Sequence, residues 1–153
     1  MRILGVDSSG MVASVALVED DLLVAEYSVN YKKTHSQTLL PMLDKIVKMT
    51  ELDLNTIDAI AVAAGPGSFT GLRIGAATVK GLGLALEKPV ISVPTCHGLA
   101  YNLWGSDKLI CPIMDARRSQ VYTGIYEFAK DGMQVFLDQS AMDIRALAEK
   151  LNA

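Results

Sequence analysis

The spacing of apolar and polar positions changes several times along the chain, and each change predicts an element. Residues 2–7, 12–19 and 22–29 are short runs rich in β-branched and other apolar residues, which is typical of strands. The acidic pair Asp20-Asp21 between the second and third runs predicts a tight turn. Three strands in close succession favour an antiparallel meander.

The period then becomes that of a helix over residues 34–50, where Pro41 is expected to introduce a bend because proline lacks a backbone donor. A buried strand, a helix, a second buried strand and a further helix follow; they are expected at residues 58–64, 71–86, 89–93 and 95–103. This order, β-β-β-α-β-α-β-α, is the plan of one lobe of the ribonuclease H-like and actin-like folds.

The same plan starts again in the last third of the chain. Residues 109–115 are an apolar run that ends in Asp115, as residues 2–7 end in Asp7. Two more strands and one helix are expected at residues 120–128, 133–137 and 142–151. The predicted fold is α/β and actin-like, with a complete lobe over residues 1–107 and an incomplete second lobe over residues 108–153. We therefore expect a fragment, or a naturally shortened relative, of a two-lobed protein.

Composition narrows the class of protein. Half of the 153 residues are hydrophobic and a fifth are charged, which suits a packed core. A net charge of −3 gives no general attraction to nucleic-acid phosphate, so any RNA contact has to be local or supplied by a partner. No apolar run approaches the roughly 20 residues of a membrane helix, and no export signal is evident. Two cysteines form no disulfide framework, and we expect a cytoplasmic protein without membrane contact.

The glycine-rich segment 65–75 links a predicted buried strand to a helix. Glycines there permit close backbone approach, and the start of a helix can hold an anion. The alternative is a structural turn packed against a neighbouring element. The P-loop spacing is absent, and the dinucleotide pattern would need glycine where Thr70 stands.

The segment G-P-G-S-F-T-G-L-R-I-G at 65–75 resembles the signature of the TsaB (YeaZ) family and of its catalytic paralogue TsaD. Four shorter motifs agree: G-V-D-S-S at 5–9, H-S at 35–36 followed by L-L-P at 39–41, K-P-V at 88–90 and M-D-A-R-R at 114–118. The resemblance covers residues 2 to about 128. Since the family carries a longer second lobe, this chain departs from it by truncation.

The resemblance implies a function in tRNA modification. TsaB pairs with TsaD, and the ATPase TsaE joins them. Together they transfer threonylcarbamoyl to an adenosine next to the tRNA anticodon. TsaD holds the metal and performs the chemistry, while TsaB acts as scaffold and activator and pairs with itself when TsaD is absent. The implied protein has no cofactor and no catalytic activity of its own, and it meets tRNA only through the complex.

The metal positions distinguish the two paralogues. TsaD carries an H-x-x-x-H pair shortly after the strand that follows K-P. Counted from Lys88-Pro89, these positions are Thr95 and Leu99, and neither side chain suits a transition metal. His97 lies between them, beside Cys96, and a lone histidine on a helix is more often structural.

Two other kinds of site, a peptidase site and a metal site, could be built from the serine, histidine and cysteine residues. Ser68 could serve as a peptidase nucleophile with His35 or His97 as its base, although nothing in the spacing brings them together. A metal site could join the two histidines with Cys96 and Cys111, but no standard ligand spacing supports it. Older names for the family describe it as a glycoprotease type, so a peptidase remains an alternative.

An actin-like ATPase is the other alternative. In such enzymes one acid from each lobe faces Mg²⁺-nucleotide, and Asp7 and Asp115 occupy those positions. The loop at residues 8–12 lacks the glycine-rich hairpin that grips phosphate, which favours vestigial acids. Arg117 and Arg118 could contact phosphate or RNA, or form a solvated turn.

A surface for the partner is predicted on two helices. Around residues 34–50 the apolar arc covers about half of the helical wheel, more than the roughly 100° that burial on one side needs. We assign Met42 and Met49 to the partner side, because methionine adapts to different partners. The predicted interface comprises Leu40, Met42, Leu43, Ile46 and Met49, with Gly71, Gly75, Ala77 and Gly81 of the next helix. The alternative is that the whole arc is core.

Because Thr95 and Leu99 replace the ligand pair of the paralogue, the chain is expected to bind no transition metal tightly. Elemental analysis of purified protein checks this. A content near one iron or zinc ion per chain would contradict it.

Overall fold

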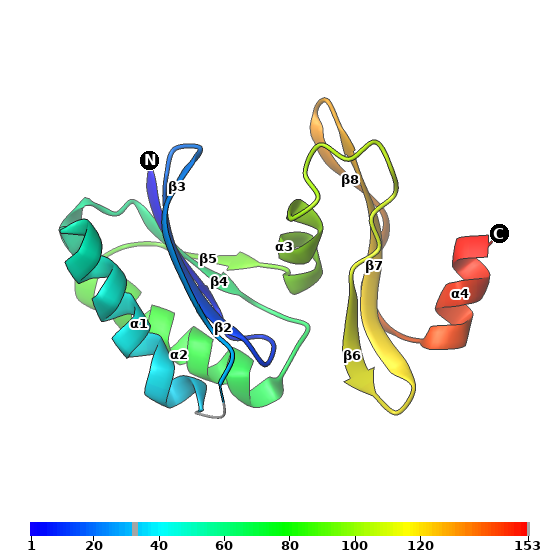
Figure 1. The fold of residues 1–153 in the computed structure, drawn as a ribbon, viewed down its shortest axis with the longest axis horizontal. Helices are drawn as coiled ribbons and strands as arrows, with labels where there is room; N and C mark the ends of the chain where they lie inside the picture. The colour runs from blue at the N-terminus through cyan, green and yellow to red at the C-terminus, as the bar shows by residue number, and fades with distance from the viewer. Residues whose placement is uncertain (32–33, 153) are drawn as a thin grey trace. The chain divides into compact units, whose positions relative to one another are not determined.

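The computed structural model describes residues 1–31 and 34–152. The chain divides into two compact units, one from Met1 to Val93 and one from Pro94 onward. Unit 1 holds a five-stranded sheet of order β3-β2-β1-β4-β5 (Figure 1). Its elements are β1 (Arg2–Asp7), β2 (Ala13–Glu19), β3 (Leu22–Val29), α1 (His35–Thr50), the short 3₁₀ helix η1 (Leu54–Thr56), β4 (Ala59–Ala63), α2 (Phe69–Leu86) and β5 (Val90–Val93).

The pairing of β1 organises unit 1. It pairs antiparallel with β2, which pairs antiparallel with β3, and this confirms the predicted meander. On its other side β1 pairs in parallel with β4, and β4 in parallel with β5. Because side chains alternate along a strand, Leu4 faces the same way as its register partners Leu17 and Ile60.

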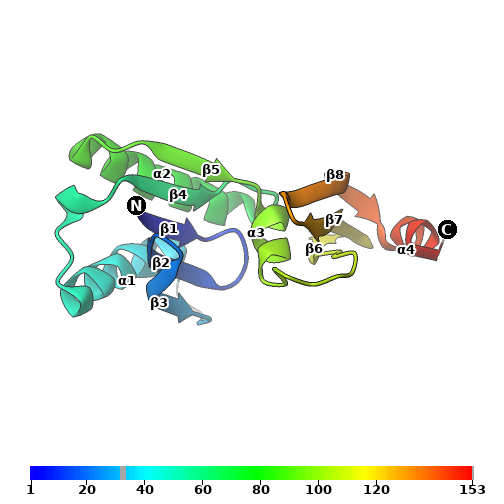
Figure 2. The same ribbon diagram turned by 90° about the horizontal axis from the view of Figure 1, so that it is seen from above.

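Both helices of unit 1 cover this one face of the sheet (Figures 1 and 2). The core between them is apolar throughout; its buried members include Leu4, Val6, Val15, Leu17, Leu39, Met42, Leu43, Ile46, Ile60, Val62 and Val79. Helix α1 begins with a capping box between Thr34 and Gln37 and continues through Pro41 to Thr50. No described helix is both long and apolar enough to cross a membrane.

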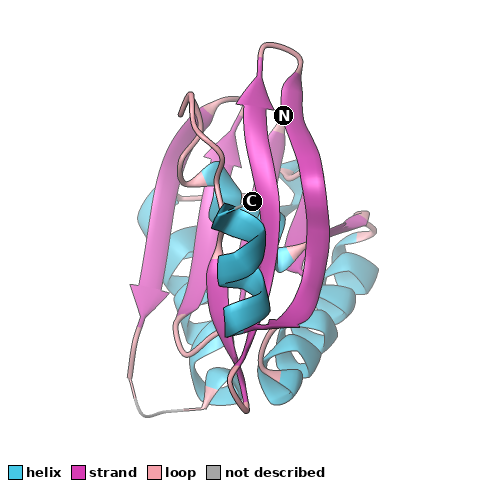
Figure 3. Cartoon of the chain, turned by 90° about the vertical axis from the view of Figure 1, so that its right-hand side faces the viewer, coloured by secondary structure: helices cyan, strands magenta, loops and turns pink. Residues whose placement is uncertain are grey.

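Unit 2 repeats the meander with a smaller core. Its elements are α3 (Thr95–Tyr101), β6 (Ile113–Arg117), β7 (Gln120–Ala129), β8 (Gly132–Asp143) and α4 (Ile144–Asn152). The strands pair antiparallel in the order β6-β7-β8, with α3 and α4 on opposite faces of the sheet (Figures 1 and 3). The predicted element order from residue 109 to 151 is thus confirmed.

Three boundaries differ from the prediction. The units separate after Val93 rather than after residue 107, because α3 packs Cys96 against Tyr126 in the core of unit 2. Strand β6 begins at Ile113 rather than 109; the preceding Pro112 has no N–H to donate to a ladder. Strand β8 extends to Asp143 rather than ending at 137. Its later residues pair with β7 although their sequence lacks the alternation of a strand.

Tyr126 is fully buried in unit 2, and its hydroxyl has no hydrogen-bond partner among the described residues. Burial, followed by the nearby Cys96, Asp138 and Cys111, raises the pKa of Tyr126 to about 12. The folded state therefore keeps a proton that the unfolded chain loses near pH 10, and stability falls as the pH rises from about 10 to about 12.

Tyr126→Phe is expected to remove this part of the alkaline destabilisation and to leave neutral-pH stability unchanged or higher, because an unpaired buried hydroxyl is unfavourable. Urea unfolding at pH 9 and pH 11 measures both effects. Tyr31→Phe, at an exposed tyrosine, is the control. Equal pH dependence of Tyr126→Phe and wild type would contradict the prediction.

Candidate functional site

The glycine-rich segment 65–75 lies against the loop that follows β1. The buried Ser8 hydroxyl donates to the carbonyl oxygen of Gly71 over 2.8 Å. The backbone N–H of Ser68 donates to the carbonyl oxygen of Ser9 over 2.6 Å. These bonds hold the end of β1 against the start of α2, so the face of the segment that carries Gly71 and Gly75 is covered by the protein's own loop.

Three glycines make this close approach possible. A Cβ on Gly67 would overlap the carbonyl oxygen of Ser9, and a Cβ on Gly71 or Gly75 would overlap the carbonyl or hydroxyl oxygen of Ser8. The assignment of Gly71 and Gly75 to a surface between helices of different subunits is therefore wrong. Their spacing of four places them on one face of α2, but that face meets the protein's own loop.

Ser68 and His35, the candidate nucleophile and base, each have another partner. The Ser68 hydroxyl accepts from the N–H of Gly71 over 3.3 Å and caps α2. His35 Nε2 lies 2.9 Å from the carbonyl oxygen of Gly10, and since a carbonyl only accepts, this nitrogen carries the hydrogen and donates. No hydrogen bond joins the two side chains in the described part of the chain. The histidine instead ties α1 to the loop after β1.

Asp7 and Asp115, the two acids predicted at strand ends, lie in different units. Each accepts a hydrogen bond from the backbone N–H two residues later. Asp7 Oδ1 accepts from the N–H of Ser9, and Asp115 Oδ1 accepts from the N–H of Arg117, each over 2.7 Å. The Asp7 carboxylate thus fixes the turn after β1, and the Asp115 carboxylate fixes the irregular end of β6, where its pairing with β7 shifts register. Their proposed history as magnesium ligands stays a prediction.

The positions that correspond to the metal pair of the paralogue lie on α3 of unit 2. Thr95 is buried and Leu99 is partly exposed, while the ring of His97 meets Tyr126 edge-on with centroids 5.1 Å apart. His97 Nε2 lies 3.9 Å from Asp138 Oδ1. Among residues 1–31 and 34–152, no three or more His, Cys, Asp or Glu side chains are grouped so that they could hold a metal ion.

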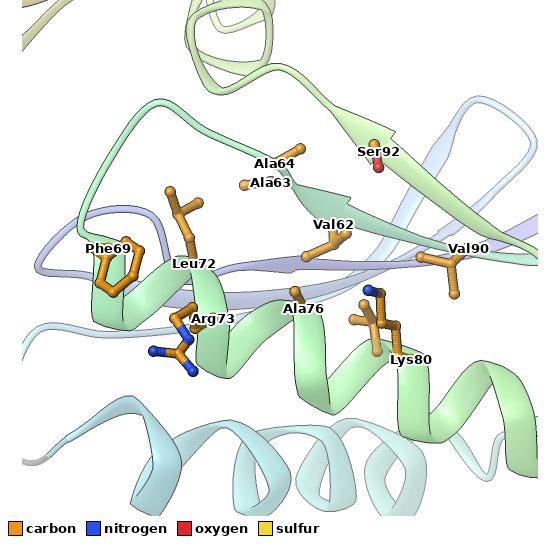
Figure 4. A pocket seen from close by; sticks show the side chains of 11 residues that line it. Val62, Ala63, Ala64, Phe69, Leu72, Arg73, Ala76, Lys80, Val90 and Ser92 are labelled. Atoms are coloured by element: carbon orange, nitrogen blue, oxygen red, sulfur yellow. The ribbon is translucent and has the colours of Figure 1, made fainter.

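A groove of about 370 Å³ lies between α2 and the β4–β5 edge of the sheet (Figure 4). Its walls are mostly apolar, and its two charged residues are Arg73 and Lys80, with no carboxylate among the described lining. The amino group of Lys80 points toward the strands, whereas the Arg73 guanidinium turns away from them (Figure 4) and lies 5.3 Å from the ring centroid of Phe69. The groove suits an apolar group that carries a negative charge.

The residues predicted to form the interface on α1 are of two kinds, buried and exposed. Met42 is 2% exposed and packs in the core with Leu43 and Ile46, so the assignment of these three residues to the interface is wrong. The sheet and α2 together bury more of α1 than one neighbour would. Met49, 72% exposed, and Leu40 remain on the surface.

On α2 the predicted Ala77 and Gly81 are also exposed. Two large apolar residues of α2 that were not predicted are exposed as well, Phe69 at 75% and Leu84 at 83%. At about 100° per residue, Leu84 lies within about 60° of both Ala77 and Gly81 on the helical wheel, so a wheel drawn for α2 would have grouped it with them. Phe69 lies in the first turn and about 120° from Gly81, and no such pattern indicates its exposure.

Comparisons with known proteins agree on one family. A family model described as "TsaD: tRNA N6-adenosine threonylcarbamoyltransferase" matches residues 23–151. The tRNA threonylcarbamoyladenosine biosynthesis protein TsaB of Bacillus subtilis (strain 168) is 40% identical over 144 residues, 93% of this chain and 62% of that relative. YeaZ from Pseudomonas aeruginosa superimposes with a TM-score of 0.81 at 31% identity, over 93% of this chain and 67% of that one. The chain belongs to the TsaB (YeaZ) family.

Membership of the TsaB family confirms the resemblance carried by residues 65–75. The chain spans 62% of the length of the Bacillus relative. The activator of 2-hydroxyisocaproyl-CoA dehydratase from Clostridium difficile, solved with bound ADPNP, has a TM-score of 0.54 at 15% identity, covering 100% of this chain and 53% of that one. This more distant likeness concerns the fold alone and agrees with the predicted actin-like α/β class.

Two glycines of α2 provide a matched test of the Ser8 contact. Gly71→Ala is expected to lower the free energy of unfolding by about 1–3 kcal/mol, because the new methyl group overlaps the Ser8 carbonyl. Gly81→Ala has open space around the new Cβ and is expected to raise the free energy of unfolding by about 0.5–1 kcal/mol, because alanine favours the helix more than glycine does. Urea denaturation measures both. A Gly71→Ala protein as stable as Gly81→Ala would mean that Ser8 does not press on α2.

Proposed function

We propose that this chain is a non-catalytic subunit of tRNA threonylcarbamoyladenosine synthesis, which binds a TsaD-type protein and activates it. The observation that carries the proposal is the contact between Ser8–Ser9 and the glycines of α2. In a phosphate-binding enzyme such glycines leave room for the ligand. Here the protein's own backbone fills that room, which supports a role in assembly rather than catalysis.

The partner surface is proposed on the outer faces of α1 and α2. Both helices connect parallel strands of one sheet, so they run in the same direction, and Met49 and Leu84 lie near their C-terminal ends. Exposed large apolar residues at one end of a helix pair favour burial by another protein. Ala77 and Gly81 allow a partner helix to approach α2 closely.

The charges beside this surface suit an acidic partner segment. Arg73 and Lys80 are exposed and have no ion pair among the described residues. A partner helix with a carboxylate could pair with either of them at the edge of the groove. We extend the proposal to the other associations implied by the family: a homodimer through the same surface when the chain is alone, and a larger complex with TsaE that brings in tRNA.

The double variant Met49→Asp with Leu84→Asp is expected to stay folded, because both side chains are exposed, and to weaken binding to the TsaD-type protein of the same organism about 10–100-fold. Self-association is expected to weaken as well. Circular dichroism measures folding, and co-purification with titration measures binding.

Two single variants complete this test. Leu22→Asp, at an exposed leucine of the edge strand β3, is expected to leave binding unchanged. Met42→Asp is expected to unfold unit 1, because it places a charge in the core. Full partner binding by the double variant would place the interface elsewhere. Turnover of ATP with Mg²⁺ by the purified chain would instead favour the ATPase alternative.

A further inference from the structure

The hairpin between β6 and β7 has an uncommon backbone at its tip. Arg117, Arg118 and Ser119 have φ angles of +64°, +52° and +61°. The left-handed region is sterically unfavourable for residues with a Cβ, and two-residue hairpin turns usually use Asn and Gly there. Strain of this kind is a reason to look for a function of the side chains that the turn presents.

A third arginine reaches the same end of unit 2. The N–H of Ile144, the first residue of α4, donates to the carbonyl oxygen of Ser119 over 3.1 Å. Arg145 follows directly, and β8 reaches the same edge through the pairing of Asp143 with Gln120 (Figure 1). The start of α4 is thereby bonded to the hairpin tip, which places Arg145 near Arg117 and Arg118.

The acids at this end form no ion pair with the arginines among the described residues. Asp115 accepts from the N–H of Arg117, and Asp143 accepts from the N–H of Arg145 over 2.8 Å, so both carboxylates are bonded to backbone. All three arginine residues are exposed, and within the described chain none of them forms an ion pair. Three exposed guanidinium groups without an ion pair in the described chain therefore lie at one end of unit 2, beside the carboxylates of Asp115 and Asp143, on a chain whose net charge is −3.

We propose that Arg117, Arg118 and Arg145 form a site for the phosphate backbone of RNA, so that this subunit contacts the RNA directly. Guanidinium groups match phosphate oxygens with paired donors, which lysine does not. An acidic protein needs such a local site, because its overall charge repels nucleic acid. The inference rests on the proposed function for the choice of RNA over another polyanion.

The test is the binding of an unmodified tRNA transcript, followed by fluorescence anisotropy between about 50 and 200 mM salt. Each phosphate contact adds about 0.7–0.9 to the magnitude of the slope of log affinity against log salt. The variant with Arg117, Arg118 and Arg145 all changed to Ala is expected to bind at least tenfold more weakly at low salt, with a slope smaller by about 2–3. The corresponding triple Lys variant keeps the charge and is expected to keep most of the slope.

Lys130→Ala is the matched control. This exposed lysine lies in the turn between β7 and β8, at the other end of β7 from the arginines, and its loss is expected to leave affinity and slope unchanged. Arg118→Gly adds a second measurement. Glycine relieves the left-handed strain, so the melting temperature is expected to stay equal or rise while RNA affinity falls.

The proposal is overturned if the triple Ala variant binds tRNA with the affinity and slope of wild type, or if Lys130→Ala weakens binding as strongly. It is also overturned if the triple Ala variant loses the TsaD-type protein while tRNA binding persists, since the arginines would then contact a protein. Partner binding by wild type is measured in parallel. If wild type binds the TsaD-type protein but not tRNA, this inference fails while the proposed function stands.

Discussion

The contact between Ser8–Ser9 and the glycines of α2 determines how unit 1 is built. It joins the end of the central strand to the start of a helix, and His35 adds α1 to the same point through the Gly10 carbonyl. Backbone brought this close leaves no space for a side chain, so glycine is required there for steric reasons. The contact also turns the opposite face of α2, with Phe69 and Leu84, toward the surface.

The antiparallel meanders of the two units share an order of strands but differ in the residues that follow the first strand. In both, an aspartate near the end of the first strand accepts from the N–H two residues later. In unit 1 the chain then enters a buried serine loop that α2 covers. In unit 2 it enters an exposed hairpin that carries Arg117 and Arg118. The shared carboxylate therefore stabilises local backbone in each unit, and the side chains that follow it account for the different surfaces.

The chain has a net negative charge, but its basic groups are concentrated at particular places. Among the described residues, basic groups without an ion pair occur beside the groove of unit 1, at Arg73 and Lys80, and in the β6–β7 hairpin of unit 2, at Arg117 and Arg118. An overall negative charge disfavours non-specific contact with nucleic acid, while local clusters still permit specific contacts. This combination fits a subunit that recognises defined partners.

The sequence by itself determined the order and type of nearly every element, because burial of one face imposes a period of 2 or 3.6 on the local pattern. It also indicated the family, through residues 65–75 together with Thr95 and Leu99 at the metal positions of the paralogue. Only the tertiary structure decided which residues of these elements are exposed. A helical wheel shows that α1 has a wide apolar arc, but not that the sheet and α2 together cover Met42 and leave Met49 free. Likewise, the spacing of Gly71 and Gly75 predicts a close contact, and only the folded chain shows that Ser8, which lies far away in sequence, makes it.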